Sequence, residues 1–107
     1  MLLNSILLEG TLKTQPVYTP APSEDSFDRC SFTLDCGPSA PAIPVIANHG
    51  LAQRCRELLD EGSSIRVVGR IIHDTVASES SGSFILAILS EHIEVKPSAS
   101  HRHAEVA

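Results

Sequence analysis

Cationic side chains at strand spacing are the residues of this sequence that could do chemistry. Arg66 and Arg70 are four positions apart, and side chains at even spacing point to the same face of a β-strand. Together they could hold phosphate groups along a narrow basic groove. The other candidates for this groove come from neighbouring elements: Lys13, Arg29, His49, His73 and one surface ring, Tyr18. The alternative is that each arginine pairs with a nearby acid and only solvates the sheet.

The cysteines and the paired histidines have spacings that do not suit a metal site. Cys30 and Cys36 lie on one strand face about 20 Å apart, which is too far for both to bind one ion. Cys55 falls on the apolar face of a predicted helix, so we expect all three as small core residues. His101 and His103 could chelate a metal only weakly. We expect no metal and no cofactor.

A catalytic arrangement is also missing from the sequence. The glycine of Gly62-Ser63-Ser64 leads into a strand and not into a helix, so it does not predict a phosphate-binding loop. Asp35 and Glu9 are outward-facing strand carboxylates, and the serines of residues 78–83 have no neighbouring base. The sequence therefore predicts a protein that is not an enzyme.

Composition places these residues in one small domain. The chain has 107 residues, of which 42% are hydrophobic and 4% aromatic, and its formal net charge is -5. A chain of about 100 residues can bury one core, which excludes a large substrate-enclosing enzyme. The acidic balance argues against bulk electrostatic attraction to nucleic acid. With no apolar run near the length of a membrane span, no leader and no disulfide framework, we expect a cytoplasmic protein.

Period-two alternation predicts the first strands. The clearest one spans residues 28–36, and residues 5–13 behave likewise, with Gly10 marking a bulge or bend. A third strand is predicted over residues 43–47, where Pro44 makes it short or places it at an edge. The side chains that the clearest strand turns inward are Cys30, Phe32, Leu34 and Cys36.

The period changes after this strand. Apolar residues at i, i+4, i+7 and i+8 predict a helix of about three turns, capped by Asn48 and stopped near Gly62. Its apolar face is formed by Leu51, Cys55, Leu58 and Leu59. Two more strands are predicted, over residues 65–72 and 84–95, and the second is apolar on both faces through Leu89, which indicates a subunit interface.

The remaining segments are predicted as loops or a tail. Residues 14–26 carry prolines and residues 75–83 are rich in serine, so both are predicted as mobile loops. Residues 97–107 have no periodicity and are predicted to be disordered, after a domain that spans residues 1–96. Three strands, a helix and two strands are the order of the OB-fold, an all-β five-stranded barrel with one helix between strands 3 and 4.

Short segments along most of the chain resemble one family. The segments are Asn4–Leu12, Gln15–Pro20, Cys30–Leu34, Val45–Ala52 and Leu58–Ile71. In this order they are similar to the opening strand, the next turn, the second strand, the third strand with its helix, and the fourth strand of bacterial single-stranded DNA-binding proteins. The primosomal replication proteins are near relatives. The resemblance covers residues 4 to about 95.

The resemblance implies an OB-fold that assembles as a dimer or tetramer and binds single-stranded DNA without sequence preference, in replication, recombination or repair. Replication proteins would be candidate partners, and no membrane would be involved. Such binding combines cations along the phosphates with rings that stack on bases, each ring contributing about 1 to 3 kcal/mol. On this basis Arg66 and Arg70 are expected to contact phosphates.

The chain departs from the family in its rings and its end. Where the family carries aromatic residues, this chain has residues 37–42, Ala47 and Val76, all small or aliphatic. It also lacks the acidic, phenylalanine-terminated tip of typical members. We assign its own phenylalanines to the core or to an interface, namely Phe27, Phe32 and Phe84. The alternative function is therefore an OB-fold used for protein contacts, as an assembly or primosome-like adaptor with weak or no DNA binding.

Overall fold

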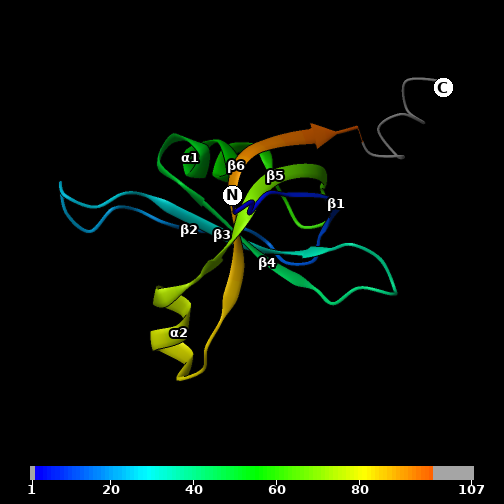
Figure 1. Ribbon diagram of the computed structural model, residues 1–107. Coiled ribbons are helices and arrows are strands. Elements are labelled where there is room, and N and C mark those ends of the chain that lie inside the picture. Colours follow the sequence, from blue (N-terminus) through cyan, green and yellow to red (C-terminus); the bar gives the residue numbers. More distant parts are fainter. Residues whose placement is uncertain (1, 98–107) are drawn as a thin grey trace.

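The computed structural model describes residues 2–97 as a strongly curved sheet with two helices. The elements are β1 (Ile6–Leu12), β2 (Val17–Thr19), β3 (Arg29–Asp35), β4 (Ile43–Asn48), α1 (His49–Leu58), β5 (Ser64–His73), α2 (Thr75–Ser81) and β6 (Leu86–Lys96). Figure 1 shows α1 close against the strands, whereas α2 projects away from them between β5 and β6. Neither of these helices has the length and apolarity that a membrane crossing requires.

The sheet closes into a barrel. Its strand order is β1-β5-β6-β4-β3-β2, and a further pairing between β1 and β3 joins the two sides. Strand β2 is a three-residue addition that pairs with β3 only. The other five strands form the barrel, and α1 lies between its third and fourth strands in chain order, β4 and β5. The predicted five-stranded OB-fold with a helix at this position is confirmed.

The interior of the barrel holds the residues that strand alternation assigned to it. Cys30, Phe32 and Leu34 of β3 are buried, and Ile6 and Leu8 of β1 pack against the same cluster. Because successive side chains of a strand point to opposite faces, the residues that alternate with these buried ones point outward. The outer face of β3 therefore presents polar side chains next to a rigid core.

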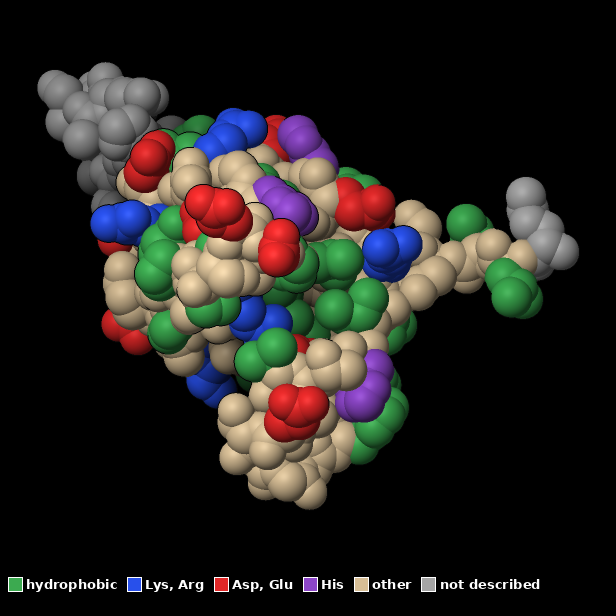
Figure 2. Space-filling view, turned by 90° about the vertical axis from the view of Figure 1, so that its left-hand side faces the viewer, with side chains coloured by type: hydrophobic (Ala, Val, Ile, Leu, Met, Phe, Trp, Pro, Cys, Tyr) green, Lys and Arg blue, Asp and Glu red, His purple; other side chains and the backbone are tan. Residues whose placement is uncertain are grey.

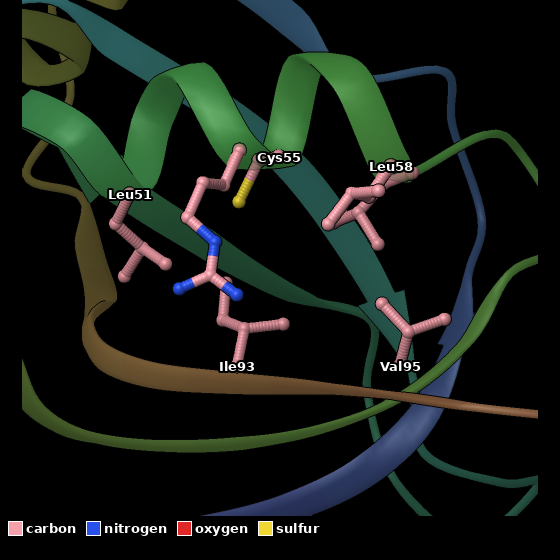
Figure 3. A pocket seen from close by; sticks show the side chains of 7 residues that line it. Leu51, Cys55, Leu58, Ile93 and Val95 are labelled. Carbon is pink, nitrogen blue, oxygen red and sulfur yellow. The ribbon is translucent and has the colours of Figure 1, made fainter.

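Helix α1 covers one end of the barrel. Figure 3 shows Leu51, Cys55 and Leu58 on the side of the helix that faces Ile93 and Val95 of β6. A cavity of about 20 Å³ remains between them, which is close to the space of one water molecule. Cys55 is buried as predicted, but Leu58 is 55% exposed and lies at the margin of the apolar face.

Two segments predicted as loops contain regular structure. Residues 75–83 include helix α2, because the side chain of Asp74 caps the N–H of Ala77 and Gly82 ends the helix at a φ of 74°. Residues 14–26 include β2, which is held by its pairing with β3. The predicted tail lies outside the described residues, apart from Pro97.

Two glycines let neighbouring strands approach each other closely. A Cβ atom at Gly10 would lie 2.3 Å from the carbonyl oxygen of Asp35, where β1 begins to pair with β3. A Cβ at Gly69 would lie 2.3 Å from the carbonyl oxygen of Leu89, beside a register shift between β5 and β6. Any side chain at these positions must push backbone aside.

We expect Gly69→Ala to lower the free energy of unfolding by about 2 kcal/mol or more, because the new methyl group overlaps a backbone carbonyl that cannot rotate away. Urea unfolding followed by circular dichroism measures this loss. Gly50→Ala in α1 is the matched control, since nothing lies within 4 Å of its Cβ position. Equal stability of the two variants would contradict the expected strain at Gly69.

Candidate nucleic-acid interface

A groove of about 400 Å³ lies on the outer face of β3 and β4. Arg29 and Asn48 are register partners in its floor, and both point outward because Cys30 and Ala47 point into the core. One wall is formed by the segment before β3 and the other by the junction of β5 and α2. In Figure 2 hydrophobic side chains gather at the hollow between the body of the molecule and the lower lobe that α2 forms.

An ion pair lies in the floor of this groove. Nη2 of Arg29 donates a hydrogen bond to Oδ2 of Asp74 over 2.7 Å, and the Arg29 and Asp74 side chains are 22% and 5% exposed. Burial raises the pKa of the Asp74 carboxyl, but the hydrogen bonds from Arg29 and from the N–H of Ala77 outweigh it and hold that pKa below its ordinary value. Asp74 is therefore charged at neutral pH, and it neutralises Arg29.

A pair of rings stands at each wall of the groove. The Phe27 and His49 rings are tilted against each other with their centroids 4.7 Å apart. The His73 and Phe84 rings are stacked at 4.1 Å, and Nε2 of His73 lies 3.0 Å from the hydroxyl of Ser78. Phe27 and His73 line the groove itself, whereas Phe84 lines an adjoining hollow against α2, which His73 also lines. Both pairs offer flat apolar surface near the Arg29–Asp74 pair.

Of the three phenylalanines assigned to the core or to an interface, Phe32 lies in the core and the other two are exposed on this chain. Phe32 is buried at 4% exposure, as its inward parity predicted, but Phe27 is 46% and Phe84 is 71% exposed. Both of these rings lie outside the strands, Phe84 because β6 begins at Leu86 and not at residue 84 as predicted. Their polar neighbours, which include Ser26, Asp28 and Ser83, are the signal that could have indicated exposed rings.

Arg66 belongs to an ion-pair network on another part of the barrel. It points outward from β5, as predicted, and contacts Glu9 of β1 at 3.1 Å and Glu94 of β6 at 3.5 Å. Lys96 contacts Glu9 as well, at 2.6 Å. The hydrogen bonds from Lys96 and Arg66, together with their charges, hold the pKa of Glu9 below its ordinary value. Arg66 is thus paired with acids, the alternative that the sequence left open.

Tyr18 is also engaged within the protein. Its hydroxyl donates a hydrogen bond to Oδ2 of Asp28, and the guanidinium of Arg56 lies over its ring, 4.7 Å from the centroid. The hydrogen bond to Asp28 raises the pKa of Tyr18, and the same bond lowers the pKa of Asp28. With its ring half-buried against the core and one face covered, Tyr18 offers little surface for stacking.

Lys13 and Arg70 are exposed at positions away from the groove floor. Lys13 follows β1 and its backbone N–H is bonded to Thr33, whereas Arg70 lies near the end of β5 opposite Leu89. Neither side chain forms a salt bridge with another residue of the described chain. The structure therefore gathers three of the predicted site residues at the groove, namely Arg29, His49 and His73.

A second groove, of about 520 Å³, adjoins the first on the same outer face. Apart from Arg29 and Asp74, its polar lining consists of uncharged side chains of the loop after β1 and of β3, namely Thr14, Gln15, Ser31 and Thr33. Ala77 of α2 forms part of the opposite wall. Arg29, Ile46 and Asp74 line both grooves, so the Arg29–Asp74 pair stands at their border.

The cysteines contribute no reactive group to this face. Burial raises the pKa of the Cys55 thiol to about 12 and also raises the pKa of Cys30. Cys36 is partly buried, and burial raises its pKa as well. Across residues 2–97 no three His, Cys, Asp or Glu side chains are grouped as metal ligands would be. The histidines at 101 and 103 lie outside the described residues.

Comparison with solved structures identifies the fold. A single-stranded DNA-binding protein from Thermus aquaticus superimposes with a TM-score of 0.74 at 22% sequence identity, over 91% of this chain and 42% of the other. The fold is that of the single-stranded DNA-binding proteins. The single-stranded DNA-binding domain of a Synechococcus protein superimposes with a TM-score of 0.70 at 11% identity, over 88% of this chain and 97% of the other.

The comparisons reach no further than the fold. No family model matches the chain, and no curated protein matches it. The chain spans less than half of the Thermus aquaticus protein. Because identities of 22% and 11% leave side chains free to differ, the binding chemistry must be argued from the residues of this chain.

Proposed function

We propose that this protein binds single-stranded DNA, without sequence preference, along the groove on the outer face of β3 and β4. The observation that carries the proposal is the placement of two ring pairs, Phe27 with His49 and His73 with Phe84, beside that groove. Unpaired bases stack on rings of this kind, and each contributes about 1 to 3 kcal/mol. Replication, recombination and repair are the processes in which such a protein would act, in the cytoplasm.

The location of the groove supports the same ligand. OB-folds bind oligonucleotides on the face of their second and third strands, between the loop after the first strand and the loop before the last. In this chain those strands are β3 and β4, and those loops carry Phe27 and α2. The groove occupies this position, so a strand crossing it would meet Phe27 and His73, and a strand that continued past His73 along α2 would meet Phe84.

Cations would contribute less than rings. Arg29 is neutralised by Asp74, and Arg66 is paired with Glu9 and Glu94. Exposed Lys13 and Arg70 are free to contact phosphates that leave the groove, and they complete the set of proposed contacts with Arg29, His49 and His73. Stacking on uncharged rings gives binding that is tolerant of sequence.

We also propose that copies of the chain associate through the outer face of β1. Leu7 is 64% exposed there, and its register partner on β5 is the half-buried Val68. Within residues 2–97, the edge of β1 opposite β5 is paired with β3 only at Thr11 and Leu12. An open edge beside apolar side chains favours pairing with another strand. A dimer or tetramer would cover it.

The second candidate function is an adaptor that binds proteins. It is favoured by the net charge of -5 and by the acids that already pair with Arg29 and Arg66. Fluorescence polarisation with labelled oligo-dT, at low and moderate salt, separates the two functions. Tight binding that depends on the length of the oligonucleotide supports the DNA-binding protein. Absence of binding below about millimolar protein concentration supports the adaptor.

We expect Phe84→Ala and Phe27→Ala each to weaken binding of labelled oligo-dT by about 5- to 100-fold, because each removes one stacking surface. Fluorescence polarisation titrations measure the change. Leu58→Ala is the control, since it removes an exposed apolar side chain from α1, outside both grooves. If both phenylalanine variants bind as well as the control, the rings are not a binding surface.

The double variant Arg66→Ala/Arg70→Ala tests the two strand arginines. We expect the slope of log affinity against log salt concentration to become shallower by about 0.7, which is the contribution of one phosphate on a single strand. Only one phosphate is expected to be lost because Arg66 is already paired with acids. Arg54→Ala, on the exposed face of α1, corrects for net charge. A change of about 1.4 would assign a phosphate to Arg66 as well, and an unchanged slope would remove both residues from the site.

We expect the wild-type chain to sediment or scatter as a dimer or tetramer and Leu7→Lys to shift it towards the monomer, because a charge at this edge opposes strand pairing. Size-exclusion chromatography with light scattering measures the mass. Leu58→Lys, which places the same charge on α1, should leave the assembly intact. A monomeric wild-type protein would contradict the proposed association.

A further inference from the structure

The two grooves on the outer face of β3 and β4 form one path with a barrier across it. The first groove is lined by one ring of each ring pair, Phe27 and His73, and the second presents hydroxyl and amide groups among apolar side chains. Both contain Arg29, Ile46 and Asp74 in their lining. Ile46 is 2% exposed and forms the floor between them. The Arg29–Asp74 ion pair therefore spans the path at the point where the grooves meet.

Asp74 ties three parts of the molecule together at this barrier. Its Oδ2 accepts the hydrogen bond from Arg29 of β3, and its Oδ1 accepts the N–H of Ala77 as the cap of α2. Its backbone N–H donates to the carbonyl of Ile85, just before β6. Only the contact with Arg29 crosses to β3. Breaking that contact would free the path and would leave the helix cap in place.

We propose that the Arg29–Asp74 pair is a latch, which opens when a phosphate of the bound strand takes the place of the Asp74 carboxylate on Arg29. The inference rests on the proposed function of the same site. With the latch open, the two grooves form a continuous track across the face. One part of the strand then lies against the rings, and the next part lies along the hydroxyl groups of Thr14, Ser31 and Thr33.

The chemistry of Arg29 suits this exchange. A guanidinium binds a phosphate in the same forked geometry in which it binds a carboxylate, so a phosphate can replace Asp74 without a change in the arginine. Arg29 is 22% exposed and can be reached from the groove. Asp74, once released, retains the N–H of Ala77 as a partner, which lowers the cost of losing Arg29.

Contacts in the second groove would favour a bound strand that crosses the barrier. Hydroxyl, amide and backbone groups contact phosphates and sugars without reading the sequence. A strand confined to the first groove would leave the latch closed and would gain only the stacking contacts with the rings. A strand that spans both grooves gains these further contacts, which offset the loss of the ion pair. The Asp74 carboxylate thus acts as an internal competitor of the ligand.

The test compares Asp74→Asn with Glu94→Gln. Asparagine removes the competing charge and remains a good helix cap. Glutamine at position 94 removes one charge from the ion pair with Arg66, outside both grooves, and so corrects for net charge. Labelled oligo-dT is titrated by fluorescence polarisation over a range of salt concentrations, and thermal unfolding checks that each variant is folded.

If the latch exists, Asp74→Asn binds oligo-dT about tenfold more tightly than wild type, which corresponds to one hydrogen bond to a charged group. Its salt dependence steepens by about 0.7, because in wild type the Asp74 carboxylate that the phosphate displaces takes up a cation, which offsets the cation that the strand releases at Arg29. Adding Arg29→Met abolishes both gains. Glu94→Gln changes neither. Should Asp74→Asn fail to fold, Asp74→Ser provides the same neutral cap, and the same increases are expected.

Equal or weaker binding by the neutral Asp74 variants, with an unchanged salt slope, would overturn the latch. If the neutral Asp74 variants give that result while wild type binds and the phenylalanine variants bind more weakly, the proposed function stands and only the latch falls. If no variant binds oligo-dT, both fall. In the unmutated protein, the Nε–H resonance of Arg29 should shift in NMR spectra on addition of oligo-dT while that of Arg66 stays. An unshifted Arg29 resonance under saturating oligo-dT would also overturn the latch.

Discussion

Closure of the barrel is the constraint on which the rest of this structure depends. One strand, β1, must pair with β5 along most of its length and reach β3 at its end, and this requires the bare backbone of Gly10 against the carbonyl of Asp35. Closure leaves no free edge on β4 and fixes the outer face of β3 and β4 as a rigid surface. At Gly69, the close approach of β5 and β6 and the register shift beside it lead into the extension that carries α2. The groove exists because that extension stands beside the rigid face.

The parts of this fold that are local in sequence could be predicted from it. Alternation over residues 28–36 is a property of one strand, so it correctly placed Cys30, Phe32 and Leu34 in the core and Arg29 outside. Helix α2 could not be found in this way, because a serine-rich segment has no helical periodicity and a low helix propensity. It forms at the Asp74 cap, and that carboxylate is held by Arg29, 45 residues away. A pattern within a window of ten residues carries no information about such a contact.

In the candidate site, too, the sequence predicted the direction of a side chain but not the residues that it contacts. Parity predicted that Arg66 points outward, and it does, but its acids come from positions 57 and 28 residues distant. Whether an outward cation is free or paired depends on register between strands, which single-strand periodicity does not determine. The exposure of Phe27 and Phe84 on this chain could not be predicted, for a related reason. Hydrophobic residues in loops are buried or exposed according to what packs over them, and only the tertiary structure decides this.

An acidic protein that binds an acidic polymer must gain its affinity at short range. Repulsion from a net charge of -5 extends over roughly the Debye length, about 8 Å at physiological salt, so it acts mainly on the approach of the strand. In the proposed complex bases would lie against Phe27 and Phe84, where stacking would operate at contact distance and would be insensitive to that charge. The few available cations then determine register and not overall affinity, since phosphate contacts position a strand. Under the proposed function, the aromatic pairs, and not a basic surface, would therefore be the part of this OB-fold that makes an acidic chain compatible with a nucleic-acid ligand.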